Sequence, residues 1–184
     1  MFKIETKRLF LRDMILSDLK SFVAISQERD YQEYYSEQDC QPELYEKLTR
    51  QFVDQANQLP RQAYQLAVEC RATSQMIGVV CLRLESGDQA SFGCGLATNR
   101  WGEGLMHEAA RALLNYGFER LKIHRIYAET ISENCSAIKL CHSLKMRKEA
   151  HFFQHRFFKQ RWWDTAVYAI LRNEWLKINS REEV

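Results

Sequence analysis

The segment from 99 to 106 has the residue types needed to bind an anion. It reads Asn-Arg-Trp-Gly-Glu-Gly-Leu-Met and places two closely spaced glycines where a predicted strand passes into a predicted helix. The free N–H groups at a helix start carry about half a positive charge, and glycine lets the chain approach a phosphate without a Cβ atom. The pattern therefore predicts a pyrophosphate site, although ordinary strand-to-helix turns also contain such glycine pairs.

The same residues argue against two other phosphate-binding motifs. No Gly-Lys-Ser or Gly-Lys-Thr follows the turn, so it lacks the groups that hold the β- and γ-phosphates and magnesium of a nucleoside triphosphate. The third glycine of the dinucleotide fingerprint is also absent. A nucleotide hydrolase and a dehydrogenase are both disfavoured.

Composition limits the remaining classes. The chain has 184 residues, 46% of them hydrophobic, which suffices for one α/β core, and we expect residues 1–184 to form a single domain. The net charge of +2 is spread along the chain and predicts neither a nucleic-acid nor a membrane partner. Residues 1–12 lack the long apolar run of a signal peptide and no stretch approaches the roughly 20 apolar residues of a bilayer span, so we expect a soluble protein that is not exported. Six cysteines without a CxxC pair or a zinc-like cluster predict reduced thiols, a cytoplasmic location and no metal.

Hydrophobic periodicity predicts the elements that must position this turn. Strands are expected at 8–12, 64–70, 76–84, 89–96, 125–130, 150–158 and 162–171, and helices at 17–26, 42–60, 104–120 and 134–144. The strand, helix and strand between 89 and 130 form a parallel crossover, which is right-handed. The predicted fold class is α/β, with a mixed sheet of about seven strands flanked by helices on both faces.

Four blocks of residues carry a resemblance to a known family. The first is Glu-Thr-Lys-Arg-Leu-Phe-Leu-Arg at 5–12, and the second is Trp-Gly-Glu-Gly-Leu-Met-His-Glu-Ala at 101–109. The third combines the strand residues 124–129 with the helix start at 134–138, and the fourth is the C-terminal segment 161–175. In this order they resemble the general amine N-acetyltransferase superfamily, and within it the Rim-type enzymes that acetylate the N-termini of ribosomal proteins. The resemblance implies a strongly bent, mostly antiparallel sheet and acetyl-CoA as the co-substrate.

The resemblance also implies which residues contact CoA. The pyrophosphate loop would comprise Trp101, Gly102, Glu103, Gly104, Leu105 and Met106. Leu96 and Thr98 would contact the pantetheine arm. Asn134 would bind the amide-rich part of CoA or cap the helix that starts there, a position that asparagine favours for reasons unrelated to catalysis.

The catalytic candidates are Asn134, Cys141 and Glu129. Cys141 stands where the family often has a tyrosine acid; it could protonate the leaving thiolate or be a packing residue. Glu129 could act as a base through water or be a solvated strand residue. Ser91 stands where a carboxylate is frequent, so the general base is left open.

An acceptor amine completes the expected reaction. An α-amine has a pKa near 8, against about 10.4 for lysine, so the missing carboxylate is more tolerable for an N-terminal amine. We therefore expect transfer of acetyl to a protein or peptide N-terminus. The alternatives are a small amine such as a polyamine or an antibiotic, and a non-catalytic acyl-CoA-binding sensor. The protein is expected to be a monomer or a homodimer.

Two segments could shape the acceptor site. The segment 31–39 contains three tyrosines and the acids Glu33, Glu37 and Asp39, and it predicts a negative, aromatic rim for a cationic amine. The run 151–158 is rich in aromatic residues, which we assign to core packing, with the floor of the acceptor cleft as the alternative.

Overall fold

The strands form one open sheet with a single parallel junction. The structure, a computed structural model, describes residues 1–182. The sheet order is β1-β2-β3-β4-β5-β6-β8-β7, and only β5 and β6 run parallel. The strands are β1 (Lys3–Glu5), β2 (Leu9–Asp13), β3 (Ala63–Cys70), β4 (Gln75–Glu85), β5 (Gln89–Leu96), β6 (Arg125–Ile131), β7 (Arg147–Phe158) and β8 (Arg161–Leu171). The α/β fold class with a mixed sheet is confirmed.

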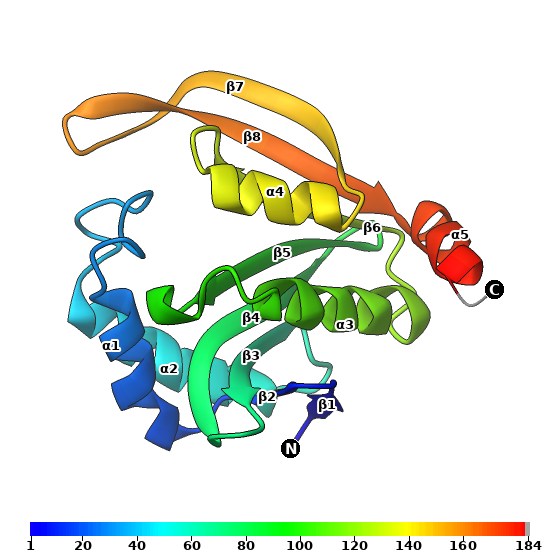
Figure 1. Cartoon of the computed structure of the whole chain (residues 1–184), viewed down its shortest axis with the longest axis horizontal. Coiled ribbons are helices and arrows are strands. Elements are labelled where there is room, and N and C mark those ends of the chain that lie inside the picture. The colour runs from blue at the N-terminus through cyan, green and yellow to red at the C-terminus, as the bar shows by residue number, and fades with distance from the viewer. Residues whose placement is uncertain (183–184) are drawn as a thin grey trace.

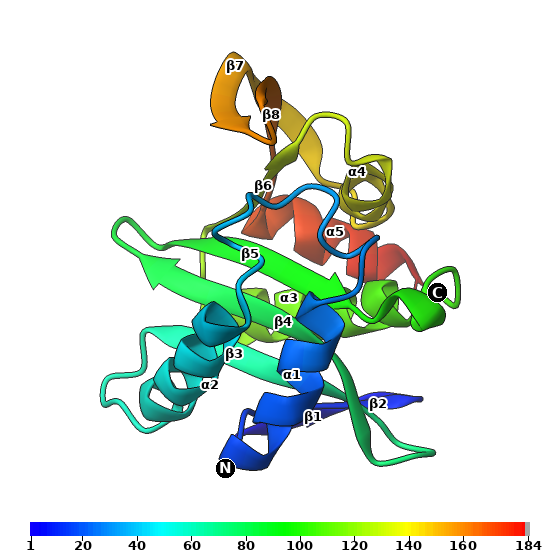
Figure 2. The ribbon, with the colours of Figure 1, turned by 90° about the vertical axis from the view of Figure 1, so that its left-hand side faces the viewer.

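Helices cover both faces of this sheet (Figures 1 and 2). The α-helices are α1 (Leu19–Ser26), α2 (Pro42–Ala56), α3 (Leu105–Glu119), α4 (Cys135–Ser143) and α5 (Arg172–Glu182), with short 3-10 turns η1 (Leu16–Asp18) and η2 (Thr98–Arg100). A large core lies between the sheet and α3, α4 and α5, and a smaller one lies under α1 and α2. Along β3, alternation sends Leu66 and Val68 into the first core and Ala67 into the second.

Two predicted boundaries were wrong and two elements were missed. The predicted strand at 8–12 is β2, whereas β1, which pairs antiparallel with it, was not predicted, so the sheet has eight strands rather than about seven. The second helix ends at Ala56 because the four residues that follow it are exposed and offer no face to the core. β7 begins at Arg147, three residues early, since its pairing with β8 extends to that point. The periodicity also missed α5, whose polar sequence is held by a buried Trp175 against Phe118.

The expectation of core packing was wrong for most of the run 151–158. β7 is an edge strand, and every residue from 151 to 157 is exposed, whereas Phe158 is buried. The β7–β8 hairpin extends past the helices, so no helix covers its outer part (Figure 2), although Tyr34 of the loop between α1 and α2 packs against Trp163. Phe157 and Phe158 line a cleft, which is the alternative that the sequence left open.

The strands β5 and β6 pair over only three positions. Ser91 pairs with Tyr127, and beyond this pair the ladder between the two strands ends. The peptide N–H of Ala97 bonds to Ile77 on the β4 side, so by alternation the peptide groups of Leu96 point away from β4. The sheet therefore opens next to the segment that leads into the two-glycine turn.

Candidate active site

The two-glycine turn has the backbone geometry that an anion site needs. Gly102 and Gly104 have φ angles of 79° and 72°, which an L side chain adopts only with strain. A Cβ at Gly102 would meet nothing within 4 Å, so the turn is open to a ligand. Among the described residues, no hydrogen bond engages the N–H groups of residues 102–106, and the buried Nε of Arg100 has no partner. Free N–H donors at the start of a helix are the groups that an anion site uses.

The N-terminal strand holds this turn in place. The Arg8 guanidinium donates to the carbonyl of Glu103 at 2.9 Å and to Glu108 at 2.7 Å. Thr6 also donates to Glu108 at 2.7 Å. Although burial opposes the shift, these hydrogen bonds keep the pKa of Glu108 below its usual value, so it is an anion in the first turn of α3. The sequence motif did not reveal this support, which comes from residues about 100 positions away.

A slot lies where β5 and β6 separate. Its volume is about 310 Å³, and its wall beside α4 includes Ala137, Leu140 and Cys141. The predicted pantetheine contacts lie at the end of this stretch of β5. The carbonyl of Leu96 accepts a hydrogen bond from the Trp101 indole at 2.8 Å, and the N–H of Thr98 donates to Glu28 at 2.6 Å. Both peptide groups therefore have partners within the chain.

The three catalytic candidates lie around the same slot. Glu129, Asn134 and Cys141 all line it. Asn134 caps α4, because its side-chain oxygen accepts the N–H of Ala137 at 3.0 Å. Cys141 is buried, and burial raises its pKa to about 11. Glu129 forms an ion pair with Arg156 at 2.5 Å.

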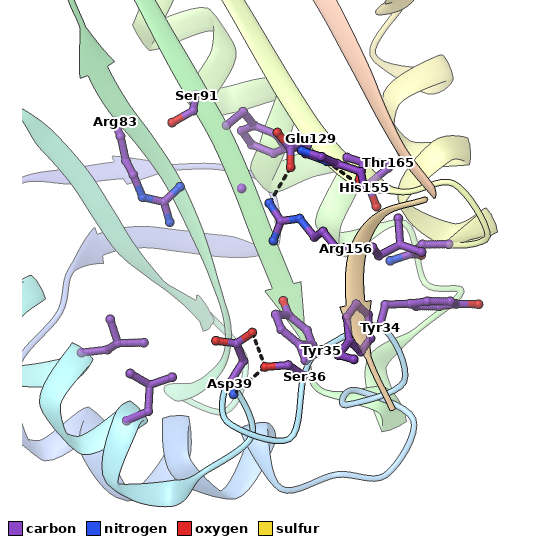
Figure 3. A pocket seen from close by; sticks show the side chains of 18 of the residues that line it. Tyr34, Tyr35, Ser36, Asp39, Arg83, Ser91, Glu129, His155, Arg156 and Thr165 are labelled. Atoms are coloured by element: carbon purple, nitrogen blue, oxygen red, sulfur yellow. Dashed lines mark hydrogen bonds and ion pairs between the residues drawn. The ribbon is translucent and has the colours of Figure 1, made fainter. Parts of the chain in front are cut away.

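A larger cleft adjoins the slot. It measures about 980 Å³ and is walled by the loop between α1 and α2, β5, β6 and the β7–β8 hairpin (Figure 3). The two cavities share nine residues, Tyr35, Tyr45, Leu48, Arg83, Phe92, Gly93, Glu129, Thr130 and Asn134, which form their junction. At the hairpin tip, Lys159 donates to the carbonyls of Gln32 and Glu33 at 2.8 and 2.9 Å, so the loop and the hairpin meet.

The predicted acidic rim is only partly present. Asp39 lines the cleft, where it accepts a hydrogen bond from Ser36 at 2.7 Å. Glu33 and Glu37 do not line it. Tyr34 and Tyr35 do, while Tyr31 lines the slot and stacks on Tyr35 with ring centroids 5.5 Å apart.

Sequence reasoning missed the arginines of this site. Arg83 and Arg156 enter from β4 and β7, on opposite sides of the junction (Figure 3). Nothing in their immediate sequence differs from the many charged residues on solvated strand faces. Only the pairing of distant strands reveals them. Among the described residues, no three histidine, cysteine or acidic side chains gather as a metal site would require, and no helix is long and apolar enough to cross a bilayer.

Residues 8–147 match the acetyltransferase (GNAT) domain family, and the chain belongs to it. An uncharacterized N-acetyltransferase, p20, from Bacillus licheniformis is 28% identical, with 92% of this chain and 96% of the relative covered. Spermidine N(1)-acetyltransferase from Vibrio cholerae is 26% identical over 92% of this chain and 96% of that protein. The protein is therefore an acetyl-CoA-dependent N-acetyltransferase that acts on an amine.

Solved structures agree with this fold. An acetyltransferase of the same family from Bacillus anthracis has a TM-score of 0.81 at 24% identity, covering 94% of this chain and all of the other. Ribosomal-protein-S5-alanine acetyltransferase from Vibrio fischeri has a TM-score of 0.80 at 18% identity, covering 95% and 99%. At these identities the likeness establishes the fold and leaves the acceptor open.

Proposed function

We propose that the acceptor is the α-amine at the N-terminus of a protein or peptide. The observation that supports this most is the acceptor cleft, whose volume of about 980 Å³ is at the upper end of the range for small-molecule pockets. Its lining includes two arginines, Arg83 and Arg156, and two carboxylates, Asp39 and Glu129, so the formal charges cancel. A polyamine carries several positive charges and would need several carboxylates that face no cation. Of these two, Glu129 is paired with Arg156, and only Asp39, bonded to the Ser36 hydroxyl, has no cationic partner.

The reaction needs little acid or base chemistry from the chain. The neutral amine attacks the thioester carbon, the C–N bond forms, and the C–S bond breaks to release the CoA thiolate. The proton lost by the amine balances the one that the thiolate gains. Near neutral pH an α-amine with a pKa near 8 is partly neutral already, so its attack does not depend on a strong base.

The three catalytic candidates fit this view unequally. Glu129 would have to leave Arg156 before it could accept a proton. A thiol with a pKa of about 11 is a poorer acid than the CoA thiol formed, so Cys141 fits a packing role better than an acid role. Asn134 fits as the cap of α4 and, through its remaining side-chain N–H groups, as a donor at the cavity junction.

The pantetheine arm fits the opening beside β5. We propose that its amides pair with the outward peptide groups around Leu96 and Thr98, in exchange for the Trp101 and Glu28 contacts. The loop from Trp101 to Met106 would hold the pyrophosphate. We place the reaction at the junction of slot and cleft, near Gly93.

Acceptor-dependent release of CoA thiol tests the proposal. Purified protein is given acetyl-CoA with peptides that have a free N-terminus, the same peptides with a blocked N-terminus and an internal lysine, or spermidine. We expect release with free N-termini only, and mass spectrometry should place the acetyl group on the α-amine. Turnover of spermidine alone would contradict the proposal, and CoA binding without release would favour a sensor.

A further inference from the structure

Arg83 differs from the other charged groups of the acceptor cleft. It lies on β4, opposite Ser91 of β5, and lines both the cleft and the slot. Its side chain makes no hydrogen bond and no ion pair with the described residues, whereas Arg156 across the junction is neutralised by Glu129. Arg83 is therefore the cation at this junction that no carboxylate balances.

The Arg83 guanidinium lies close to the floor of the site at Gly93. A Cβ built at Gly93 would lie 3.4 Å from one terminal nitrogen of Arg83 and 3.9 Å from the other. Both terminal nitrogens therefore lie close to the β5 backbone at Gly93, and both residues line the two cavities. Figure 3 shows the side chain directed into the cavity, on the opposite side from the Glu129–Arg156 pair.

A planar guanidinium with free N–H groups binds carboxylates in a bidentate manner. It also repels a second cation, which would oppose a polyamine that extends through the junction. Resting on the proposed function, we propose that Arg83 binds an acidic group close to the reacting amine. The preferred acceptors are N-termini with Asp or Glu among the first two residues.

Three peptides that differ only at the second residue test this inference. They begin Ala-Asp, Ala-Asn and Ala-Lys, and kcat/KM is measured for each with wild-type protein, Arg83→Gln and Arg83→Glu. A charge-assisted hydrogen bond is worth enough for about a tenfold preference for Ala-Asp over Ala-Asn in the wild type. Arg83→Gln should lower kcat/KM for Ala-Asp more than for Ala-Asn and so remove that preference, and Arg83→Glu should favour Ala-Lys.

A matched arginine serves as the control. Arg50 is an exposed arginine of α2 that lines neither cavity, so Arg50→Gln should keep the wild-type order. Equal use of the three peptides by the wild type would overturn the inference and leave the proposed function standing. Uniform loss on all three peptides in Arg83→Gln, at an unchanged melting temperature, would also overturn it. Turnover of spermidine and of none of the peptides would contradict both this inference and the proposed function.

Discussion

The cofactor side and the acceptor side of the site are built in different ways. On the cofactor side, β5, the two-glycine turn and the start of α3 follow one another between residues 89 and 108. The acceptor side combines the loop after α1, one residue of β4, the end of β6 and the β7–β8 hairpin, and its contacts join residues up to 127 positions apart. One side uses backbone groups set by local conformation, and the other uses side chains brought together by the sheet.

This difference has a physical basis. Free N–H groups and positive φ angles need only a few neighbouring residues of the right type. A cleft with balanced charges needs the strand order β5-β6-β8-β7, because Glu129 and Arg156 belong to strands that are not neighbours in the sheet. Substitutions can test whether each side of the site depends on its local backbone or on contacts between distant segments.

The largest effect should come from Gly102→Val. Both Gly102 and Gly87 have positive φ angles, 79° and 72°, and open surroundings, but Gly87 lies in the turn between β4 and β5. The two valine variants should therefore lose similar stability. Because only Gly102 borders the proposed phosphate cradle, only its variant should weaken CoA binding, by about 100-fold if one or two charge-assisted contacts are lost.

Calorimetric titration of CoA against both variants measures this comparison, with thermal melting as the stability control. Equal CoA affinity in Gly102→Val and Gly87→Val would mean that the turn is not the phosphate site. The phosphate site would then not be formed by this one short segment, and the contrast with the acceptor side would fail.

Gly95→Ala should have an intermediate effect at the boundary between the two sides. Its Cβ would lie 2.3 Å from the Tyr31 hydroxyl oxygen and 2.9 Å from the ring, which itself stacks on Tyr35. Overpacking of this kind costs about 1–3 kcal/mol. In a double-mutant cycle by urea unfolding, adding Tyr31→Ala should recover about 1 kcal/mol or more. Additive losses would show that the close approach is not what constrains Gly95.

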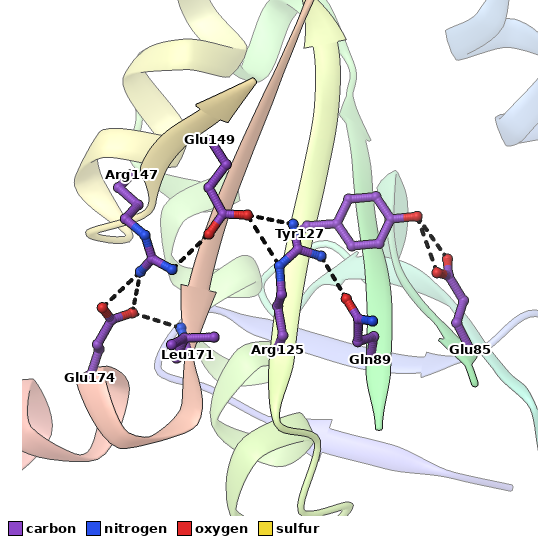
Figure 4. A network of polar contacts seen from close by, with 8 residues as sticks. All are labelled: Glu85, Gln89, Arg125, Tyr127, Arg147, Glu149, Leu171 and Glu174. Carbon is purple, nitrogen blue, oxygen red and sulfur yellow. Dashed lines mark hydrogen bonds and ion pairs between the residues drawn. The ribbon is translucent and has the colours of Figure 1, made fainter. Parts of the chain in front are cut away.

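The smallest effect should come from Glu149→Gln in the polar network that joins β6, β7 and α5 (Figure 4). Hydrogen bonds from Arg125 lead the interactions that lower the pKa of Glu149, against some desolvation by burial. The stability that ionised Glu149 contributes is therefore fully present above the pKa of the unfolded state, near 4.5. It is lost as the pH falls through the lower pKa of the folded state.

Wild-type protein should exceed Glu149→Gln in unfolding free energy by about 1 kcal/mol at pH 7, and the difference should shrink as the pH falls below 4.5 and through the lower folded pKa. Urea unfolding across this range measures it, and CoA affinity at pH 7 should be unchanged. A gap that widens in acid would contradict the sign of the shift. Reduced CoA affinity would show that the hairpin supports the cofactor side as well.

Much of the architecture could be predicted from periodicity and the family-like blocks. The predicted strands at 64–70 and 89–96 and the helix at 104–120 were placed within one or two residues, because each carries a strong apolar pattern. α5 was missed because a mostly polar helix carries no such pattern, and Trp175 becomes buried only through its contact with Phe118. The edge position of β7 was equally invisible, since alternating aromatics look the same on covered and uncovered strands.

The sequence by itself determined the fold class, the two-glycine turn and the family-like blocks. Each depends on residue type and short spacing, which steric and hydrogen-bonding rules translate directly. Only the tertiary structure decided that Arg83 enters the acceptor cleft, that Glu129 pairs with Arg156, and that Arg8 supports the turn. These relations depend on strand order and register, and a charged residue's sequence neighbours contain no record of which strand will lie beside it.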